Sequence, residues 1–200
     1  MSIDMKRFDL LIKNGTIYTA VETFDADIAV KDGKITAIGQ NLGNAERVID
    51  ANGMLVLPGG IDAHCHIEQE SSTRIMTADD FYSGSVSAAF GGNTTFLPFA
   101  AQHKGQSLQE VVKTARDRAD VKSVIDYGLH LIVSDPTEKV LEEELPSLIK
   151  EGYTSFKVYM TYEMLKINDR QMLDILVLAR KNGAMTVSYT HLTLPTIYSV

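Results

Sequence analysis

Beyond residue 60, short apolar segments alternate with segments of helical period, and this alternation constrains the fold more than any other feature of the chain. Strands are expected at 54–57, 94–99, 127–133 and 154–160, and helices at 78–90, 107–119, 137–150 and 168–182. Thr77, Ser107 and Asn168 are suited to cap three of these helices, and Pro146 should divide the 137–150 segment into two. Strands and helices that alternate at this spacing predict parallel βαβ units.

The length of this region limits the number of such units. A complete (β/α)8 barrel needs ~250 residues, and roughly 145 follow the first 56. Doubly wound sheets also alternate in this way, but they lack a pair of histidines of metal-binding type at the end of the first strand. We therefore predict an α/β fold, a partial (β/α)8 TIM-like barrel of four to five βα units.

The first fifty-odd residues have a different pattern, that of a small β module. Strands are expected at 8–13, 16–18, 27–30, 34–38 and 47–50. Asn14-Gly15 separates the first two, and Asp32-Gly33 is a strong hairpin signal between the next pair. The predicted domains are thus 1–56, the β module, and 57–186, the first half of the barrel. A tail at 187–200 fits neither.

The segment PGGIDAHCH at 58–66 carries the clearest chemistry. Side chains alternate along a strand, so His64 and His66 point the same way and Cys65 points to the other face. Two imidazoles at a strand end can bind a divalent metal, usually zinc, and leave positions open for water. A histidine pair in a surface turn is the competing interpretation. Asp62 is better interpreted as a support for the turn than as a catalytic acid.

Other residues are ambiguous when taken alone. Lys157 lies in an apolar strand, either with its stem covering apolar surface or as a functional amine whose pKa burial lowers. Tyr162, five residues later, suits packing and catalysis equally. His103 follows the second barrel strand, where it either borders a pocket or is solvated. His130 lies within an apolar run and is best interpreted as a core histidine with its hydrogen bonds satisfied.

Composition excludes some classes of function. The chain is 44% hydrophobic and 22% charged, which is globular, and its net charge of -7 argues against nucleic acid or an anionic membrane as partner. No apolar run approaches the ~18 residues of a membrane span, and the first residues contain no apolar signal core. With Cys65 as its single cysteine, the chain can form no internal disulfide. A cytoplasmic location is expected.

Two separated motifs, PGGIDAHCH at 58–66 and TSFKVYMTYE at 154–163, resemble the dihydropyrimidinase and D-hydantoinase family of amidohydrolases. The resemblance extends from residue 8 to about 186. It implies metal-dependent opening of a dihydropyrimidine or 5-substituted hydantoin ring to an N-carbamoyl amino acid. It further implies two divalent ions, typically Zn²⁺, held by His64 and His66 and bridged by a carboxylated Lys157. Tyr162 would bind substrate and stabilise the oxyanion, and the full-length protein would be a homotetramer.

The tail departs from this pattern. In the family, the strand after residue 186 supplies a further metal-binding histidine, which is absent here, and the context of His191 does not match it. We therefore interpret 187–200 as foreign to the family, and the chain as a truncated and inactive part. Allantoinase or dihydroorotase activity is an alternative, although Tyr162 favours a hydantoinase. A second alternative is a non-catalytic, oligomeric scaffold related to dihydropyrimidinase. Such relatives lose the metal ligands that this chain retains.

Overall fold

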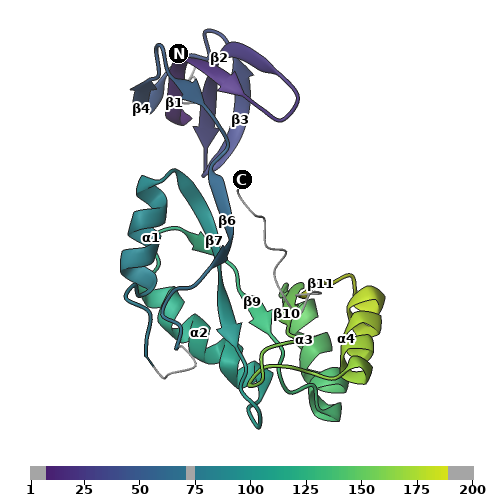
Figure 1. Cartoon of the computed structure of the whole chain (residues 1–200). Helices are drawn as coiled ribbons and strands as arrows, with labels where there is room; N and C mark the ends of the chain where they lie inside the picture. Colours follow the sequence, from purple (N-terminus) through teal and green to yellow (C-terminus); the bar gives the residue numbers. More distant parts are fainter. Residues whose placement is uncertain (1–7, 71–74, 189–200) are drawn as a thin grey trace, which may run out of the picture. The chain divides into compact units, whose positions relative to one another are not determined.

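The structure is a computed structural model that describes residues 8–70 and 75–188. Our predictions for His191 and for most of the 187–200 tail therefore lie outside the described residues. Backbone contacts divide the chain into two compact units between Gly59 and Gly60. Each unit contains one sheet (Figure 1).

The first unit is a five-stranded sheet with the order β3-β2-β1-β4, in which β5 also pairs with β1. Its strands are β1 (Phe8–Tyr18), β2 (Thr23–Lys31), β3 (Lys34–Gly39), β4 (Ala45–Asp50) and β5 (Leu55–Val56). The predicted break at Asn14-Gly15 is wrong, because β1 continues through it. Instead the register with β2 shifts between Ile12 and Gly15, with Asn14 at φ 61°. The backbone N–H of Asn14 donates to Asp27 Oδ1 at 3.0 Å, which stabilises this bulge.

The predicted hairpin between β2 and β3 is confirmed. Lys31 pairs with Lys34, and both intervening residues have positive φ, 51° at Asp32 and 70° at Gly33. A two-residue turn of this kind matches the twist of the flanking strands.

The second unit contains a parallel sheet in which strands follow one another in chain order, β6-β7-β9-β10-β11, with β8 paired to β7. The strands are β6 (Gly60–Cys65), β7 (Asn93–Ala101), β8 (Asp126–Tyr127), β9 (His130–Ile132), β10 (Ser155–Val158) and β11 (Met185–Ser188). The single strand predicted at 127–133 is divided at Gly128-Leu129. Sequential parallel strands with intervening helices confirm the predicted partial (β/α)8 barrel.

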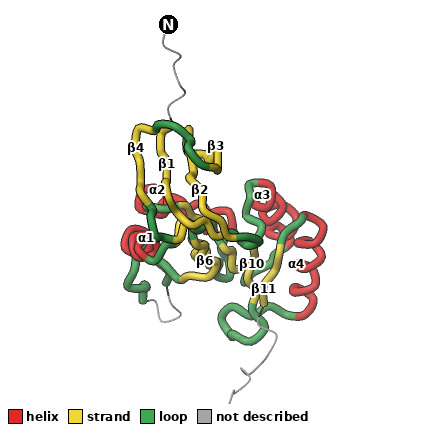
Figure 2. The backbone as a smooth tube through the Cα atoms, turned by 90° about the horizontal axis from the view of Figure 1, so that it is seen from above, coloured by secondary structure: helices red, strands yellow, loops and turns green. Residues whose placement is uncertain are grey.

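The helices connect these strands: α1 (Phe81–Phe90), α2 (Leu108–Lys122), the π-helical turn η1 (Val140–Glu144), α3 (Leu145–Lys150) and α4 (Asp169–Asn182). In Figure 2, α3 and α4 lie together beside β10 and β11. The start predicted for α1 is wrong. Thr77 instead bonds to Gln69 in the preceding loop, and Asp80 caps the helix in a capping box with Ser83.

The predicted ends of the other helices agree better with the structure than the predicted start of α1 does. Asn168 caps α4, and Gly183, at φ 73°, ends it. Pro146 lies in the first turn of α3, where its missing N–H is tolerated, so η1 and α3 join without a gap. Ser107 caps α2 as expected, but Glu144 from η1 supplies the carboxylate at that helix start.

The strands bury one face under the helices, and we call this the outer face. It carries Phe96, which packs with Phe81 and Ala119, and also Leu131 and Phe156, which pack with Leu108 and Ile175 among others. By alternation, the neighbouring residues on each strand point to the opposite side, the inner face. Within the described ranges, no helix is both long and apolar enough to cross a membrane.

Candidate metal centre and substrate site

The histidine pair lies at the end of β6 and on its inner face. The ring centroids of His64 and His66 are 5.5 Å apart, while Cys65 packs with the outer-face cluster, as alternation predicts. The backbone N–H of His64 donates to Asp62 Oδ1 at 3.1 Å, which agrees with a turn-supporting role for Asp62. Nδ1 of His66 lies 2.7 Å from Gln69 Oε1, so the loop after β6 helps to fix this ring.

Phe99 on β7 lies against both histidines. Its ring centroid is 4.8 Å from that of His64 and 4.9 Å from that of His66. On its other side it makes an edge contact with His130, at 4.9 Å between centroids. The strand register pairs Phe99 with His130, so this contact follows from the backbone arrangement.

His130 is buried, as predicted, and one of its ring nitrogens has a hydrogen-bond partner. Its Nδ1 lies 2.5 Å from Ser155 Oγ on β10. Burial lowers the pKa of His130 to about 4, and the nearby positive charges of His64 and Lys157 act in the same direction.

Lys157 lies on the inner face of β10, two residues beyond Ser155. It is 4% exposed, and its neighbours Phe156 and Val158 lie in the apolar cluster of the outer face. Burial lowers the pKa of its amine. The Nζ atom is 5.4 Å from the centroid of the Tyr159 ring. Lys157 is thus a buried amine on the same face as the histidine pair, three strands away across β7 and β9.

Tyr162 lies in the turn after β10. Its side chain is 55% exposed and makes an edge contact with Tyr159, at 5.1 Å between ring centroids. Tyr159 therefore links Tyr162 to the lysine, since the Lys157 amine faces the same ring. Tyr162 thus lies at the edge of the sheet formed by the C-terminal ends of the strands.

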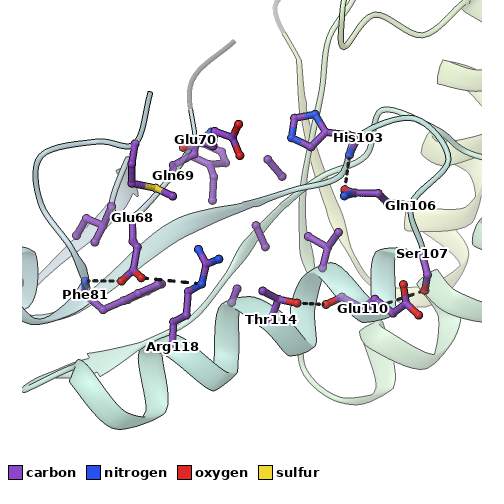
Figure 3. Close-up of a pocket in the computed structure, with 17 residues that line it drawn as sticks. Glu68, Gln69, Glu70, Phe81, His103, Gln106, Ser107, Glu110, Thr114 and Arg118 are labelled. Atoms are coloured by element: carbon purple, nitrogen blue, oxygen red, sulfur yellow. Dashed lines mark hydrogen bonds and ion pairs between the residues drawn. The ribbon is translucent and has the colours of Figure 1, made fainter. Parts of the chain in front are cut away.

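His103 lies apart from this group. It borders a cavity of about 310 Å³ between the loop after β6 and helix α2 (Figure 3). The residues that line the cavity include Phe81, Phe99 and Val111. Arg118 points from α2 toward Glu68. None of His64, His66, Lys157 and Tyr162 lines the cavity. The cavity adjoins the histidine pair through Phe99 and through Gln69, which contacts His66.

The available donors fit metal binding of the kind that the family resemblance implies. Two imidazoles share the end of β6, and imidazole nitrogen is a common zinc ligand. In residues 8–70 and 75–188, no three His, Cys, Asp or Glu side chains gather closely enough to hold a metal ion.

Sequence reasoning missed two residues of this region. Phe99 and Ser155 were not selected, although alternation along their strands places them on the inner face with Ala101 and Lys157. The position of Phe99 one strand from the histidine pair was the available signal. Cys65 lies on the face opposite the histidine pair, as alternation predicted; it is partly buried, and burial raises the pKa of its thiol to about 12.

Comparison with known proteins places this arrangement in a family, although no protein-family model matches the chain. The chain is 46% identical over 180 residues to a D-hydantoinase of Geobacillus stearothermophilus and 50% identical over 182 residues to that of Ralstonia pickettii. These matches cover 88% and 90% of the chain but 38% and 39% of the relatives. A dihydropyrimidinase of Rattus norvegicus is 37% identical over 183 residues, covering 88% of the chain and 35% of that protein.

Solved structures agree with the sequence matches. A structure of a D-hydantoinase superposes with a TM-score of 0.87 at 48% identity, covering 92% of this chain and 40% of that one. The chain thus spans about two fifths of the length of the relatives it matches. Over that span it belongs to the D-hydantoinase and dihydropyrimidinase family.

Proposed function

We propose that the complete protein is a metal-dependent hydrolase of cyclic amides, and that this chain supplies part of its active site. The observation that carries the proposal is that His64, His66 and Lys157 lie on the inner face of one parallel sheet, toward the C-terminal ends of β6 and β10. In (β/α)8 enzymes the working residues lie at this end of the strands. Its substrate is a dihydropyrimidine or 5-substituted hydantoin, matching the names of its relatives.

The histidines and the lysine have separate roles in this proposal. His64 and His66 would each supply one imidazole nitrogen as a ligand to a divalent ion, most suitably Zn²⁺. The neutral amine of Lys157 attacks the carbon of carbon dioxide, forming an N–C bond as one C=O π bond becomes C–O⁻, and then loses a proton from nitrogen; the resulting anionic carbamate would serve as a further ligand to the two ions. When bound, the ions lower the pKa of water and polarise the ring carbonyl. Burial of Lys157 favours the neutral amine that this modification needs.

Tyr162 acts on the substrate. Its exposed hydroxyl donates a hydrogen bond to the carbonyl oxygen as negative charge develops there. Tyr159 packs on the Tyr162 ring and holds it beside the lysine. His103, on a loop after β7, contributes at most to the rim of the substrate pocket. The complete protein is further expected to be a cytoplasmic homotetramer.

The test uses the complete protein, purified with its metals, and hydantoin, dihydrouracil, allantoin and dihydroorotate as substrates. Turnover of hydantoin or dihydrouracil, with about two ions per subunit, supports the proposal. Activity on only the last two substrates would reassign it to an allantoinase or dihydroorotase. A protein that binds no metal and turns over none of the four would be a scaffold.

Two substitutions assign the roles. Lys157→Ala should abolish the second ion and the activity. Tyr162→Phe should keep both ions and lower kcat by about 10²–10³-fold, as loss of an oxyanion donor does. Tyr82→Phe, at an exposed tyrosine on α1, is the matched control and should change neither quantity. The 200-residue chain alone should be inactive, because the further ligands that the family resemblance implies are not in its sequence.

A further inference from the structure

A row of inner-face side chains connects the two strands that carry the proposed metal ligands. Ser155 on β10 contacts His130 on β9 at 2.5 Å, the His130 ring contacts Phe99 on β7 at 4.9 Å, and Phe99 contacts His64 and His66 on β6 at 4.8 and 4.9 Å. We propose that Phe99 is a positioning residue that fixes the orientation of both imidazoles, and that Ser155 and His130 fix Phe99 in turn. This inference rests on the proposed function and adds residues to its site.

The geometry explains why an aromatic ring is suited to this place. Phe99 lies edge-on to His64, with 81° between the ring planes, and is tilted by 31° to His66. Aromatic pairs at such separations are worth about 0.5–1.5 kcal/mol beyond the area they bury. A ring that meets two imidazoles at once restricts rotation of both. An aliphatic side chain of similar volume would leave them free to turn.

The same row of side chains also supports the spacing between the histidine pair at the end of β6 and Lys157 on β10. Lys157 is two residues beyond Ser155 on the same face of β10. The contact between Ser155 and His130 therefore also restrains the backbone that carries the lysine. His130 is buried between the two strands, and its Nδ1 is engaged by the serine. Metal ligands typically depend on such outer contacts, whose loss lowers metal affinity by about 10–100-fold.

The same strand offers a matched control for Phe99. Phe96 and Phe99 are both buried, at 0% and 6% exposure, but Phe96 lies on the outer face against Phe81 and Tyr127. Replacing either by leucine removes a buried ring from β7. Only Phe99→Leu removes one that touches the histidines.

The experiment measures the imidazole C–H resonances of the metal-free 200-residue chain by NMR, with assignments from His64→Gln and His66→Gln. In the unsubstituted chain, the Phe99 ring current should shift the His64 and His66 resonances away from those of a solvated histidine. Phe99→Leu should collapse these shifts, Phe99→Tyr should retain them, and Phe96→Leu should leave them in place. Unchanged shifts in Phe99→Leu, or an equal collapse in Phe96→Leu, would overturn the inference.

Two further measurements complete the test. Ser155→Ala should shift the His64 and His66 resonances in the same direction as Phe99→Leu does, but by less. An absence of any shift would overturn the inference that Ser155 and His130 fix the position of Phe99. Co²⁺ titration of the complete protein carrying the same substitutions should show affinity at least 10-fold weaker in Phe99→Leu than in Phe96→Leu. A complete, unsubstituted protein that binds no Co²⁺ would count against the proposed function, whereas the NMR result would still decide the role of Phe99.

Discussion

The two faces of the parallel sheet are built by the same strands but differ in chemistry. The outer face is apolar and closed by helices, with Phe96, Leu131 and Phe156 fully buried in it. The inner face carries imidazoles, a hydroxyl and an amine at the corresponding positions: His64, His66, His130, Ser155 and Lys157.

The outer face therefore supplies most of the stability of the sheet, whereas the inner face carries the proposed functional groups. Burial of apolar side chains is the main favourable contribution to folding, and the outer face provides it. Buried polar groups cost free energy unless they are hydrogen-bonded, so an inner face rich in them is not selected for stability. The adjacent residues Phe156 and Lys157 represent the two roles, and substitutions at the two faces should therefore have different effects.

The largest effect on stability is expected at the outer face. Phe156→Ala removes a ring that is 0% exposed and leaves a cavity among the helices. The free energy of unfolding should fall by about 3–5 kcal/mol, measured by urea denaturation. A loss below about 1 kcal/mol would show that the outer face is not the main source of stability. Val187→Ala, at a partly exposed position on β11, is a milder control.

The next largest effect on stability is expected at Glu144, a buried charged residue among the helices. Glu144 is buried, and its carboxylate accepts hydrogen bonds from Ser107 Oγ at 3.0 Å and the Leu108 N–H at 2.7 Å. Glu144→Gln should lower the free energy of unfolding by about 2–3 kcal/mol, since bonds to a charged acceptor are lost. The exposed neighbour Glu143→Gln should change it by less than about 0.5 kcal/mol.

The Glu144 carboxylate should also make the free energy of unfolding depend on pH in the acid range. Burial acts to raise the pKa of Glu144, but the hydrogen bonds from Ser107 and Leu108 outweigh it, so the pKa lies below the ordinary value of 4.5. The stabilisation is therefore present above pH 4.5 and is lost as the pH falls through the lowered pKa. Glu144→Gln should remove that part of the acid sensitivity, and an unchanged profile would contradict the assignment.

A smaller effect concerns His130 on the inner face. Burial lowers its pKa to about 4 from an ordinary value of 6.5, so between these values the unfolded chain binds the extra proton. Stability should fall as the pH decreases through this window, by up to about 1.4 kcal/mol per pH unit. His130→Gln should flatten that slope in urea denaturation, whereas the exposed His103→Gln should keep it. A steep slope that survives in His130→Gln would refute this.

The smallest effect is expected at Lys157. Lys157→Met keeps the apolar stem and removes the buried amine, whose desolvation lowers its pKa. The free energy of unfolding at neutral pH should stay within about 1 kcal/mol of the original or rise. The unsubstituted chain should gain stability relative to Lys157→Met as the pH approaches 10.5, where the unfolded lysine also loses its proton. A loss above about 2 kcal/mol would give Lys157 a role in stability.

The features that the sequence predicted well are those set by local residues. The turn at Asp32-Gly33 and the ends of α4 at Asn168 and Gly183 depend on backbone preferences within a few positions. The partial barrel follows from periodicity over long segments. The alternation along β6 also placed His64 and His66 on one face.

The errors occur where distant segments compete with local signals. Thr77 was expected to cap α1, but Gln69 in the preceding loop binds it, so the helix begins at Phe81. The bulge at Asn14 is stabilised by Asp27 on the neighbouring strand, and hence β1 continues. Phe99 was not selected, because its place on the neighbouring strand does not by itself show its contacts with the histidine pair, which depend on strand register.

The order of strands in the parallel sheet has a consequence for biosynthesis. Each of β7, β9, β10 and β11 pairs with a strand that precedes it in the chain. The sheet can consequently grow on the ribosome one strand at a time, with every newly released segment finding its docking edge already in place. Vectorial assembly of this kind keeps each loop closure short and favours rapid folding over trapping.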